Sequence, residues 1–270
     1  MTTQKKTRIA LLGCGALSHL FAQNLTRALG DDFVLSTAYC RDDVNRTAFA
    51  ETFHCRAATS VTDLLADAPD YVVEFAGGMA LKGHAVEILE HTNLIGASVG
   101  ALADTAFLEA VRETARLHGT RFFVPGGAIG GLDVLQSFAL MGNCDFSIET
   151  RKAPGSLEGA PGLAGRTLSR ETEELVFEGT PEEAIKQFPK NVNVAVASSL
   201  AAGAKAPKLI LRSVPGAKTT THHIRVANDL SQVELTFTSR PDPSNPRSST
   251  STAWSVLALL KNLTSPVAFY

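Results

Sequence analysis

The sequence predicts an α/β protein in which a doubly wound parallel sheet is followed by a smaller α+β domain. Three observations support this prediction: strand and helix patterns alternate over roughly the first half, the first strand ends in a glycine-rich turn, and grouped strands dominate the second half. Strict alternation of strand and helix is typical of a parallel sheet with crossover helices, whereas grouped strands are typical of α+β domains.

The first half opens with a short apolar run at residues 8–12, which reads as a buried parallel strand because both of its faces are apolar. A helix follows over 18–29, with an apolar stripe and Gly30 as its C-cap. The further elements expected here are strands at 33–39, 71–75, 94–98 and 121–124, and helices at 43–53, 63–66, 82–91 and 105–118.

The second half changes character after Pro125, where a glycine-rich segment begins. A helix at 180–188 is marked by Thr180 as its N-cap and Pro181 in its first turn. The other elements expected here are helices at 132–141, 193–202 and 252–263, strands at 146–153 and 175–179, a loop at 153–165, and three antiparallel strands at 209–214, 222–227 and 233–239. These patterns predict domains at 1–127 and 128–250, and a C-terminal helix within 251–270 that packs back on the first domain.

The composition argues against several classes of partner. Twenty-five Lys and Arg against 27 Asp and Glu give a net charge of −2, so neither nucleic acid nor an anionic membrane is expected. No apolar run reaches the length of about 18 residues that a membrane-spanning helix needs, and we expect a cytoplasmic protein. The four cysteines form no CxxC spacing and no pattern with histidine, so reduced thiols and no metal are expected.

The turn after the first strand reads GCGALS over residues 13–18. Gly13 suits the tight turn, Gly15 lets the backbone approach a pyrophosphate, and the N–H groups of Ala16 and Leu17 open the helix. Ser18 replaces the third glycine of the usual fingerprint and is small enough for close packing. The turn therefore predicts a Rossmann-type dinucleotide site, and a tight turn without a ligand is the alternative.

The end of the second strand bears on the choice of dinucleotide. An NAD site usually has a carboxylate there, whereas this chain has Cys40 and Arg41, and an arginine can meet a 2′-phosphate. This favours NADP or the use of both NAD and NADP. Two alternatives remain open: Arg41 can be a solvated loop charge, and the aspartate at 42 or 43 can contact the ribose. Ala76 and Gly77 end the third long strand and are also expected at the cofactor.

Four further segments are distinctive together: SVGALAD at 98–104, PGGAIGGLD at 125–133, FPKNVNV at 188–194 and NPRSS at 245–249. With the glycine turn, they resemble the L-aspartate dehydrogenase family over nearly the whole chain. The resemblance implies a Rossmann domain followed by an α+β domain, usually in a homodimer. It also implies interconversion of L-aspartate with oxaloacetate and ammonia through iminoaspartate, using NAD or NADP, and a supply of iminoaspartate for NAD biosynthesis.

The resemblance also implies particular site residues. His222 takes the place of the family's catalytic histidine, within a segment where Thr220 replaces the usual asparagine and His223 often has an acidic counterpart. Ala128 and one asparagine of the pair at 191 and 193 match cofactor positions, and we favour Asn193.

We hypothesise that His222 is the acid and base for proton transfer, because its ordinary pKa lies near neutrality. His222 and His223 point to opposite faces of a strand, so one of them faces the cleft. The expected substrate ligands are Asn191, Ser248 and Ser249, with the glycine-rich backbone at 126–131 and the cations Lys152, Lys190 and Arg247 as further candidates for its carboxylates.

Two other functions remain open on the sequence. The same fold serves oxidoreductases similar to homoserine dehydrogenase or dihydrodipicolinate reductase, which act on other small substrates. A dinucleotide-binding sensor without catalysis is the second alternative, and Thr220 is its support.

Overall fold

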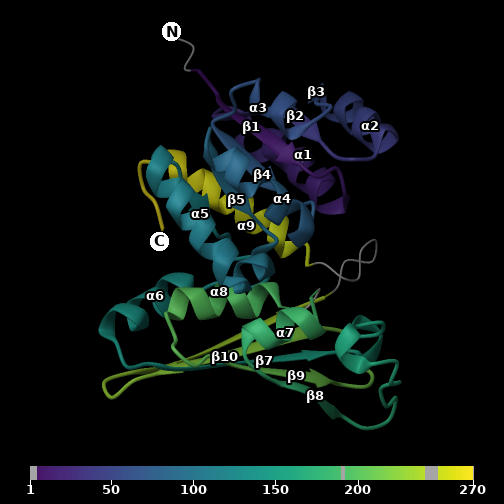
Figure 1. The fold of residues 1–270 in the computed structure, drawn as a ribbon, viewed down its shortest axis with the longest axis vertical. Helices are drawn as coiled ribbons and strands as arrows, with labels where there is room; N and C mark the ends of the chain where they lie inside the picture. The colour runs from purple at the N-terminus through teal and green to yellow at the C-terminus, as the bar shows by residue number, and fades with distance from the viewer. Residues whose placement is uncertain (1–4, 190–191, 241–248, 270) are drawn as a thin grey trace. The chain divides into compact units, whose positions relative to one another are not determined.

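The computed structural model describes residues 5–189, 192–240 and 249–269. The chain divides into two compact units, each built on one sheet (Figure 1). The first unit comprises Met1–Pro125 with Thr252–Tyr270, and the second unit comprises Gly126–Ser251.

The first unit contains a six-stranded, wholly parallel sheet in the order β3-β2-β1-β4-β5-β6. Its strands are β1 (Thr7–Leu12), β2 (Phe33–Tyr39), β3 (Arg56–Ala57), β4 (Tyr71–Glu74), β5 (Asn93–Gly96) and β6 (Phe122–Phe123). Its helices before the second unit are α1 (Ala16–Leu29), α2 (Asp43–Phe53), α3 (Val61–Leu65), α4 (Gly78–Leu89), the 3-10 helix η1 (Val99–Ala103) and α5 (Thr105–His118). The strand order reverses between β1 and β4, so the predicted doubly wound sheet is confirmed; the short β3 and η1 were not predicted.

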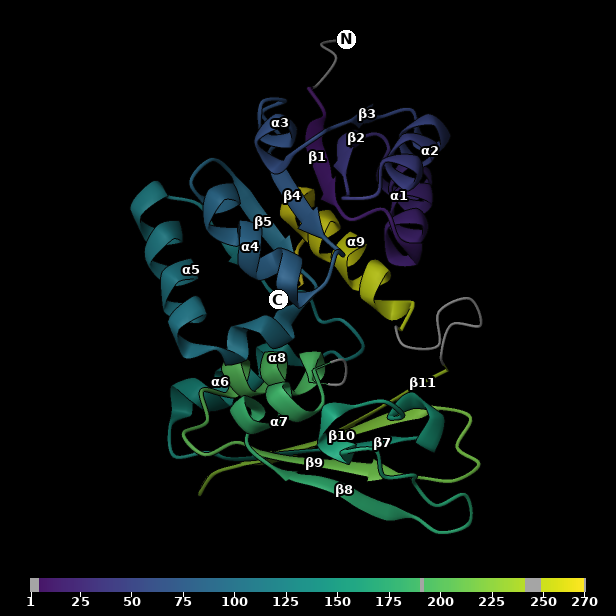
Figure 2. The same cartoon turned by 45° about the vertical axis from the view of Figure 1, so that its right-hand side comes forward.

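The last helix, α9 (Ser251–Thr264), belongs to the first unit for all but its first residue. Val256 and Leu260 of α9 are fully buried in the same cluster as Phe21 and Leu25 of α1. Figures 1 and 2 both show the yellow α9 among the elements of the first unit. The chain therefore returns to complete the core on which the glycine turn rests.

The second unit contains a mixed five-stranded sheet in the order β11-β10-β7-β9-β8. Its strands are β7 (Asp145–Lys152), β8 (Glu174–Gly179), β9 (Lys208–Ser213), β10 (Thr220–Ala227) and β11 (Gln232–Ser239). Its helices are α6 (Leu132–Met141), α7 (Pro181–Gln187) and α8 (Asn193–Ala202), and the 3-10 helices η2 (Pro154–Ser156) and η3 (Pro161–Leu163) lie in the predicted loop.

One prediction for this sheet is wrong in part. The strand expected at 209–214 was predicted to be antiparallel, yet β9 runs parallel to β7 and antiparallel only to β8. A parallel neighbour needs a long crossover, and the chain between β7 and β9 supplies it through β8, α7 and α8.

The two faces of this sheet differ. Along β7, Phe146, Ile148 and Thr150 are buried, whereas Glu149 and Arg151 alternate with them on the other face. The helices α6, α7 and α8 pack against strands of the sheet and cover its buried face (Figures 1 and 2). In the described part of the chain, no helix is both long and apolar enough to cross a membrane.

Candidate dinucleotide and substrate sites

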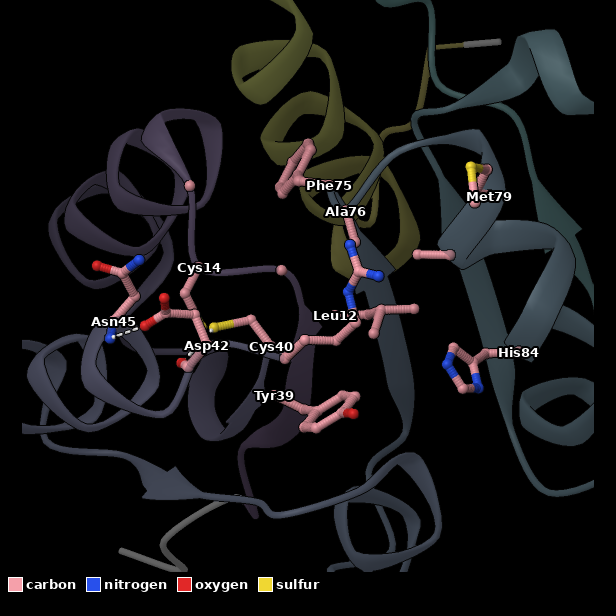
Figure 3. A pocket seen from close by; sticks show the side chains of 14 residues that line it. Leu12, Cys14, Tyr39, Cys40, Asp42, Asn45, Phe75, Ala76, Met79 and His84 are labelled. Carbon is pink, nitrogen blue, oxygen red and sulfur yellow. Dashed lines mark hydrogen bonds between the residues drawn. The ribbon is translucent and has the colours of Figure 1, made fainter.

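A cavity of about 520 Å³ opens at the carboxyl ends of β1, β2 and β4 (Figure 3). It is lined by Leu12, Gly13, Cys14, Gly15, Tyr39, Cys40, Arg41, Asp42, Asn45, Phe75, Ala76, Met79, Ala80 and His84. Its volume lies within the usual range of ligand pockets, and it lies where the strand order reverses. Open α/β sheets bind their ligands at this point of the fold.

Gly13 is required by the packing of the turn. Its φ of +114° is one that side chains rarely allow, and an added Cβ would lie 3.0 Å from the backbone of Phe75 and Ala76. Its N–H donates to the carbonyl of Tyr39 at 2.7 Å, and the N–H of Phe75 donates to the carbonyl of Leu12 at 2.9 Å. The ends of β1, β2 and β4 are thereby held together around the cavity.

Gly15 leaves space rather than filling a tight contact. An added Cβ there would find no atom within 4 Å, because the residue faces the cavity. Gly15 is the N-cap of α1, no side chain caps this helix, and its first turn has no acidic residue. The N–H groups that open α1 at Ala16 and Leu17 therefore suit an anion such as a pyrophosphate, and the cradle fits a dinucleotide.

Glu74 organises the other side of the cavity. Its side chain is fully buried at the end of β4, where Oε1 accepts from the N–H groups of Ala76 and Gly77 at 2.6 and 2.7 Å. The same carboxylate accepts from the N–H and hydroxyl of Ser98 at 3.0 and 2.8 Å. Burial raises the pKa of Glu74, while these donors act in the opposite direction. One carboxylate thus fixes the loops after both β4 and β5.

The residues that follow β2 include one cation at the cavity, and the carboxylates beside it are engaged in other contacts. Arg41 is exposed at the cavity and makes no ion pair within the described residues. The carboxylate of Asp42 accepts from the backbone N–H of Asn45 at 2.8 Å and caps α2, as Figure 3 shows. Asp43 pairs with Arg46 at 2.7 Å, so both acidic side chains near the predicted ribose position are already engaged.

In the second unit, His222 lies on the buried face of β10 and is only 4% exposed. Its Nδ1 lies 2.9 Å from Oγ1 of Thr150 on β7, and the two residues are register partners. Burial, and then the charge of Lys152, lower the pKa of His222 to about 3, so the imidazole is neutral at physiological pH. If the threonine hydroxyl donates to Nδ1, Nε2 carries the proton and can act as an acid. If the hydroxyl accepts from Nδ1, Nε2 has a free lone pair and can act as a base.

His223 lies on the opposite face of the sheet. Its Nδ1 lies 2.9 Å from Oγ1 of Thr236, and Glu234 lies 4.0 Å from its Nε2. Of the two adjacent histidines, His222 is therefore the one that the fold places in a buried polar environment.

The remaining predicted site residues are spread over both units. Gly77 is the N-cap of α4 with a φ of +99°, and Ala128 lies in a turn before α6. Asn193 is the first residue of α8, and the hydroxyl of Ser249 lies 2.6 Å from that of Ser251. Asn191, Ser248, Lys190 and Arg247 lie outside the described residues.

Sequence reasoning missed the partners of these residues. Glu74 was not singled out, although a carboxylate inside an otherwise apolar strand is a signal in itself, because burial of a charge requires partners. Thr150 was missed because its relation to His222 depends on the pairing of β7 with β10. The alternation of polar and apolar residues in β7 could not reveal that partner strand.

Comparison with known proteins matches both parts of the chain to family models. Residues 133–263 match the family model described as aspartate dehydrogenase, C-terminal, and residues 13–125 match that of the homoserine dehydrogenase NAD-binding domain. A curated L-aspartate dehydrogenase of Polaromonas sp. strain JS666 is 36% identical over 94% of this chain and 97% of its own length. The corresponding protein of Methanocaldococcus jannaschii is 30% identical over 96% and 98%.

A solved structure extends the likeness to three dimensions. The crystal structure of aspartate dehydrogenase from Thermotoga maritima superposes with a TM-score of 0.75 at 27% identity, covering 99% of this chain and all of that one. The NAD-binding family model covers the glycine turn at 13–18 and the strands β2 and β4 beside the cavity, which confirms the predicted nicotinamide dinucleotide as the cofactor class. The resemblance drawn from the sequence motifs is confirmed as well, and the chain belongs to the L-aspartate dehydrogenase family.

Proposed function

We propose that the protein is an NAD(P)-dependent L-aspartate dehydrogenase. The observation that carries this is the neutral, buried His222 held by Thr150, in the unit that matches the aspartate dehydrogenase C-terminal model. The homoserine dehydrogenase model matches only residues 13–125, which do not include this histidine. A homoserine dehydrogenase-like activity and a sensor function are therefore not favoured.

The reaction consumes L-aspartate, oxidised dinucleotide and water, and yields oxaloacetate, ammonium, reduced dinucleotide and a proton. When bound, the nicotinamide supplies hydride chemistry by accepting the hydride that leaves Cα of aspartate. Loss of that hydride and of a proton from nitrogen gives iminoaspartate, which adds water and then releases ammonia. His222 takes a proton from the amine and releases it to solvent, and it then takes a proton from the attacking water and returns it to the nitrogen that leaves.

The dinucleotide is held mainly by backbone in this proposal. The turn and helix start formed by Gly13, Gly15, Ala16 and Leu17 would hold its pyrophosphate, and its other contacts would come from Arg41, Ala76, Gly77, Ala128 and Asn193. The open space at Gly15 and the uncapped start of α1 support the pyrophosphate position. The family resemblance supports Ala128 and Asn193, and it supports Asn191, Ser248 and Ser249 as substrate ligands.

We propose further that NADP is preferred to NAD. Arg41 lines the cavity without an ion pair in the described chain, while Asp42 and Asp43 are engaged elsewhere. A guanidinium binds a 2′-phosphate through paired hydrogen bonds, whereas the 2′-hydroxyl of NAD usually requires a carboxylate.

The family resemblance supports two finer proposals: a homodimer, and a supply of iminoaspartate for NAD biosynthesis. We also propose a cytoplasmic location, as expected from the sequence. Light scattering on the purified protein tests the first, since a mass of twice 28.6 kDa is expected for the dimer.

The activity is tested in the oxidative direction. Purified protein is mixed with L-aspartate and either NAD or NADP, and the absorbance of the reduced nicotinamide is followed. We expect reduction with L-aspartate and much less with D-aspartate or L-homoserine. Reduction of the dinucleotide with L-homoserine but not with L-aspartate would contradict the proposal.

A further inference from the structure

One end of the buried face in the second unit is polar. Most of that face is apolar, as Phe146 and Ile148 on β7 illustrate, but the next two residues on the same side of β7 are Thr150 and Lys152. His222 is the register partner of Thr150 across β10. The fold thus gathers its buried polar groups at the end of the face that carries the proposed catalytic histidine.

Lys152 is the sole cation that the described residues of these strands bring to this face. Arg151 and Arg212 lie on the opposite face, where both contact Glu149 and Glu173. Lys208, also on the opposite face, pairs with Glu178 at 2.7 Å.

The polar end has hydrogen-bonding capacity that the chain does not use. Ser213 on β9 is the register partner of Lys152 and is fully buried. Its Oγ has no hydrogen-bond partner among the described residues. A buried hydroxyl without a partner is costly, and such groups often mark a place where a ligand or a water molecule binds.

The electrostatics of this end favour an incoming anion. Burial lowers the pKa of Lys152 to about 8, so the ammonium is still mainly charged at neutral pH but has lost much of its solvation by water. His222 beside it is neutral, so it does not compete for the anion. A carboxylate placed against Lys152 relieves this loss of solvation.

We propose that Lys152 is the substrate-binding cation, and that its ammonium group binds a carboxylate of the dicarboxylic substrate beside His222. This inference rests on the proposed function, because a substrate with two carboxylates is what a cation at this position would select. Lys152 is one of the three cations that the sequence offers for these carboxylates, and the other two, Lys190 and Arg247, lie outside the described residues.

Substrate binding then prepares the catalytic histidine. The charge of Lys152 is one of the two causes that hold the pKa of His222 so low. A bound carboxylate compensates that charge and so acts to raise the pKa of His222, while burial, the larger of the two causes, continues to lower it. Lys152 thus couples recognition of the carboxylate to proton transfer.

The experiment compares Lys152→Met and Lys152→Arg with a matched control, Lys208→Met, on the outer face of the same sheet. Succinate, a dicarboxylate that cannot be oxidised here, is titrated by calorimetry at saturating NADP. We expect Lys152→Met to weaken succinate binding by at least about tenfold, as for other hydrogen bonds to charged groups, and Lys152→Arg to restore part of the affinity. Lys208→Met is expected to bind as the wild type does.

Kinetics on L-aspartate provide the second readout. We expect the KM of Lys152→Met for L-aspartate to rise about tenfold or more, with NADP affinity unchanged because Lys152 is not among the residues proposed to hold the dinucleotide. Unchanged succinate affinity and unchanged KM in Lys152→Met would overturn the assignment, as would a wild type that binds no succinate. If the wild type binds succinate through Lys152 but does not oxidise aspartate, the proposed function fails and the cation site stands.

The pH dependence of succinate binding separates a direct contact from a structural role. The titratable groups on this face are Lys152, His222 and Glu174, whose carboxylate is bonded to Arg166 and to the N–H of Ser169. The helix α8 brings none, and the charged residues of α6 and α7 are all exposed: Asp133, Glu182, Glu183 and Lys186.

A group whose pKa is lowered to about 8 loses its charge as the pH rises through 8. Wild-type affinity for succinate should therefore fall between about pH 7 and 9, and Lys152→Arg should show no such fall because arginine stays charged. The same fall in both proteins would overturn the proposal.

Discussion

The two candidate sites are built in opposite ways. The cavity of the first unit owes its shape to backbone, with glycines at 13, 15 and 77 and a helix start that no side chain caps. The polar end in the second unit owes its chemistry to side chains, since regular strands place Thr150, Lys152 and His222 on one face. A backbone site is sensitive to any added Cβ, whereas a strand site is sensitive to the identity of each side chain.

The largest expected effect comes from His222→Ala. Removal of a positioned acid and base should lower kcat by about 10²- to 10⁴-fold, while dinucleotide affinity stays within a factor of about two. Turnover with L-aspartate and fluorescence titration with NADPH measure the two quantities. His223→Gln, on the outer face, is the control and should keep its turnover. Equal losses of turnover in His222→Ala and His223→Gln would contradict the assignment of the acid and base to the buried face of the sheet.

The next comparison is Gly13→Ala against Gly15→Ala. At Gly13 the new Cβ meets the backbone of Phe75 and Ala76, just after β4, at 3.0 Å and at a disfavoured φ, so the free energy of unfolding should fall by about 1–3 kcal/mol. At Gly15 the new Cβ meets no atom of the protein, so stability should be unchanged and only NADPH binding should weaken, by about 1–3 kcal/mol. Urea unfolding measures the change in stability of each variant, and NADPH titration measures the change in its dinucleotide affinity. Unweakened binding in Gly15→Ala would remove the pyrophosphate from this turn.

A smaller effect is expected from Glu74→Gln, since the carboxylate of Glu74 holds two loops of the first unit. Both carboxylate oxygens accept N–H bonds, so glutamine must turn its amide NH₂ toward a donor. The free energy of unfolding should fall by about 1–3 kcal/mol, with a loss of NADPH affinity. Glu90→Gln, at an exposed position, is the control and should change the free energy of unfolding by less than about 0.5 kcal/mol. Indistinguishable urea curves for the two variants would show that the carboxylate does not organise these loops.

The smallest effect concerns the choice of cofactor. Arg41→Ala should lower the ratio of kcat/KM for NADP to that for NAD by about tenfold, chiefly by weakening NADP. Parallel assays with NADP and with NAD measure this ratio. A ratio that does not change would make Arg41 a solvated loop charge.

The sequence was most informative where the function depends on local chain geometry. The glycine turn at 13–18 lies between an apolar run and a helical stripe, so its place at the end of a parallel strand could be predicted from neighbouring residues. The bounds of β2, α2, α5, α6 and α8 were predicted to the residue, because caps and periodicity mark them. The start of α4 was predicted four residues late, since Gly77 begins that helix without a side-chain cap.

Contacts between distant strands could not be predicted in the same way. That β9 runs parallel to β7, or that Thr150 faces His222, depends on sheet order, which periodicity does not encode. The identity of His222 as the buried member of its pair followed from the structure alone, since alternation tells only that the two histidines differ.

The most direct measurement is the rate of NADPH and NADH oxidation by the purified protein with oxaloacetate, with and without ammonium. The account predicts rapid oxidation that requires oxaloacetate and ammonium together. Oxidation without ammonium would instead identify a keto-acid reductase. No oxidation, in a protein that demonstrably binds the dinucleotide, would contradict the assignment of this site to aspartate.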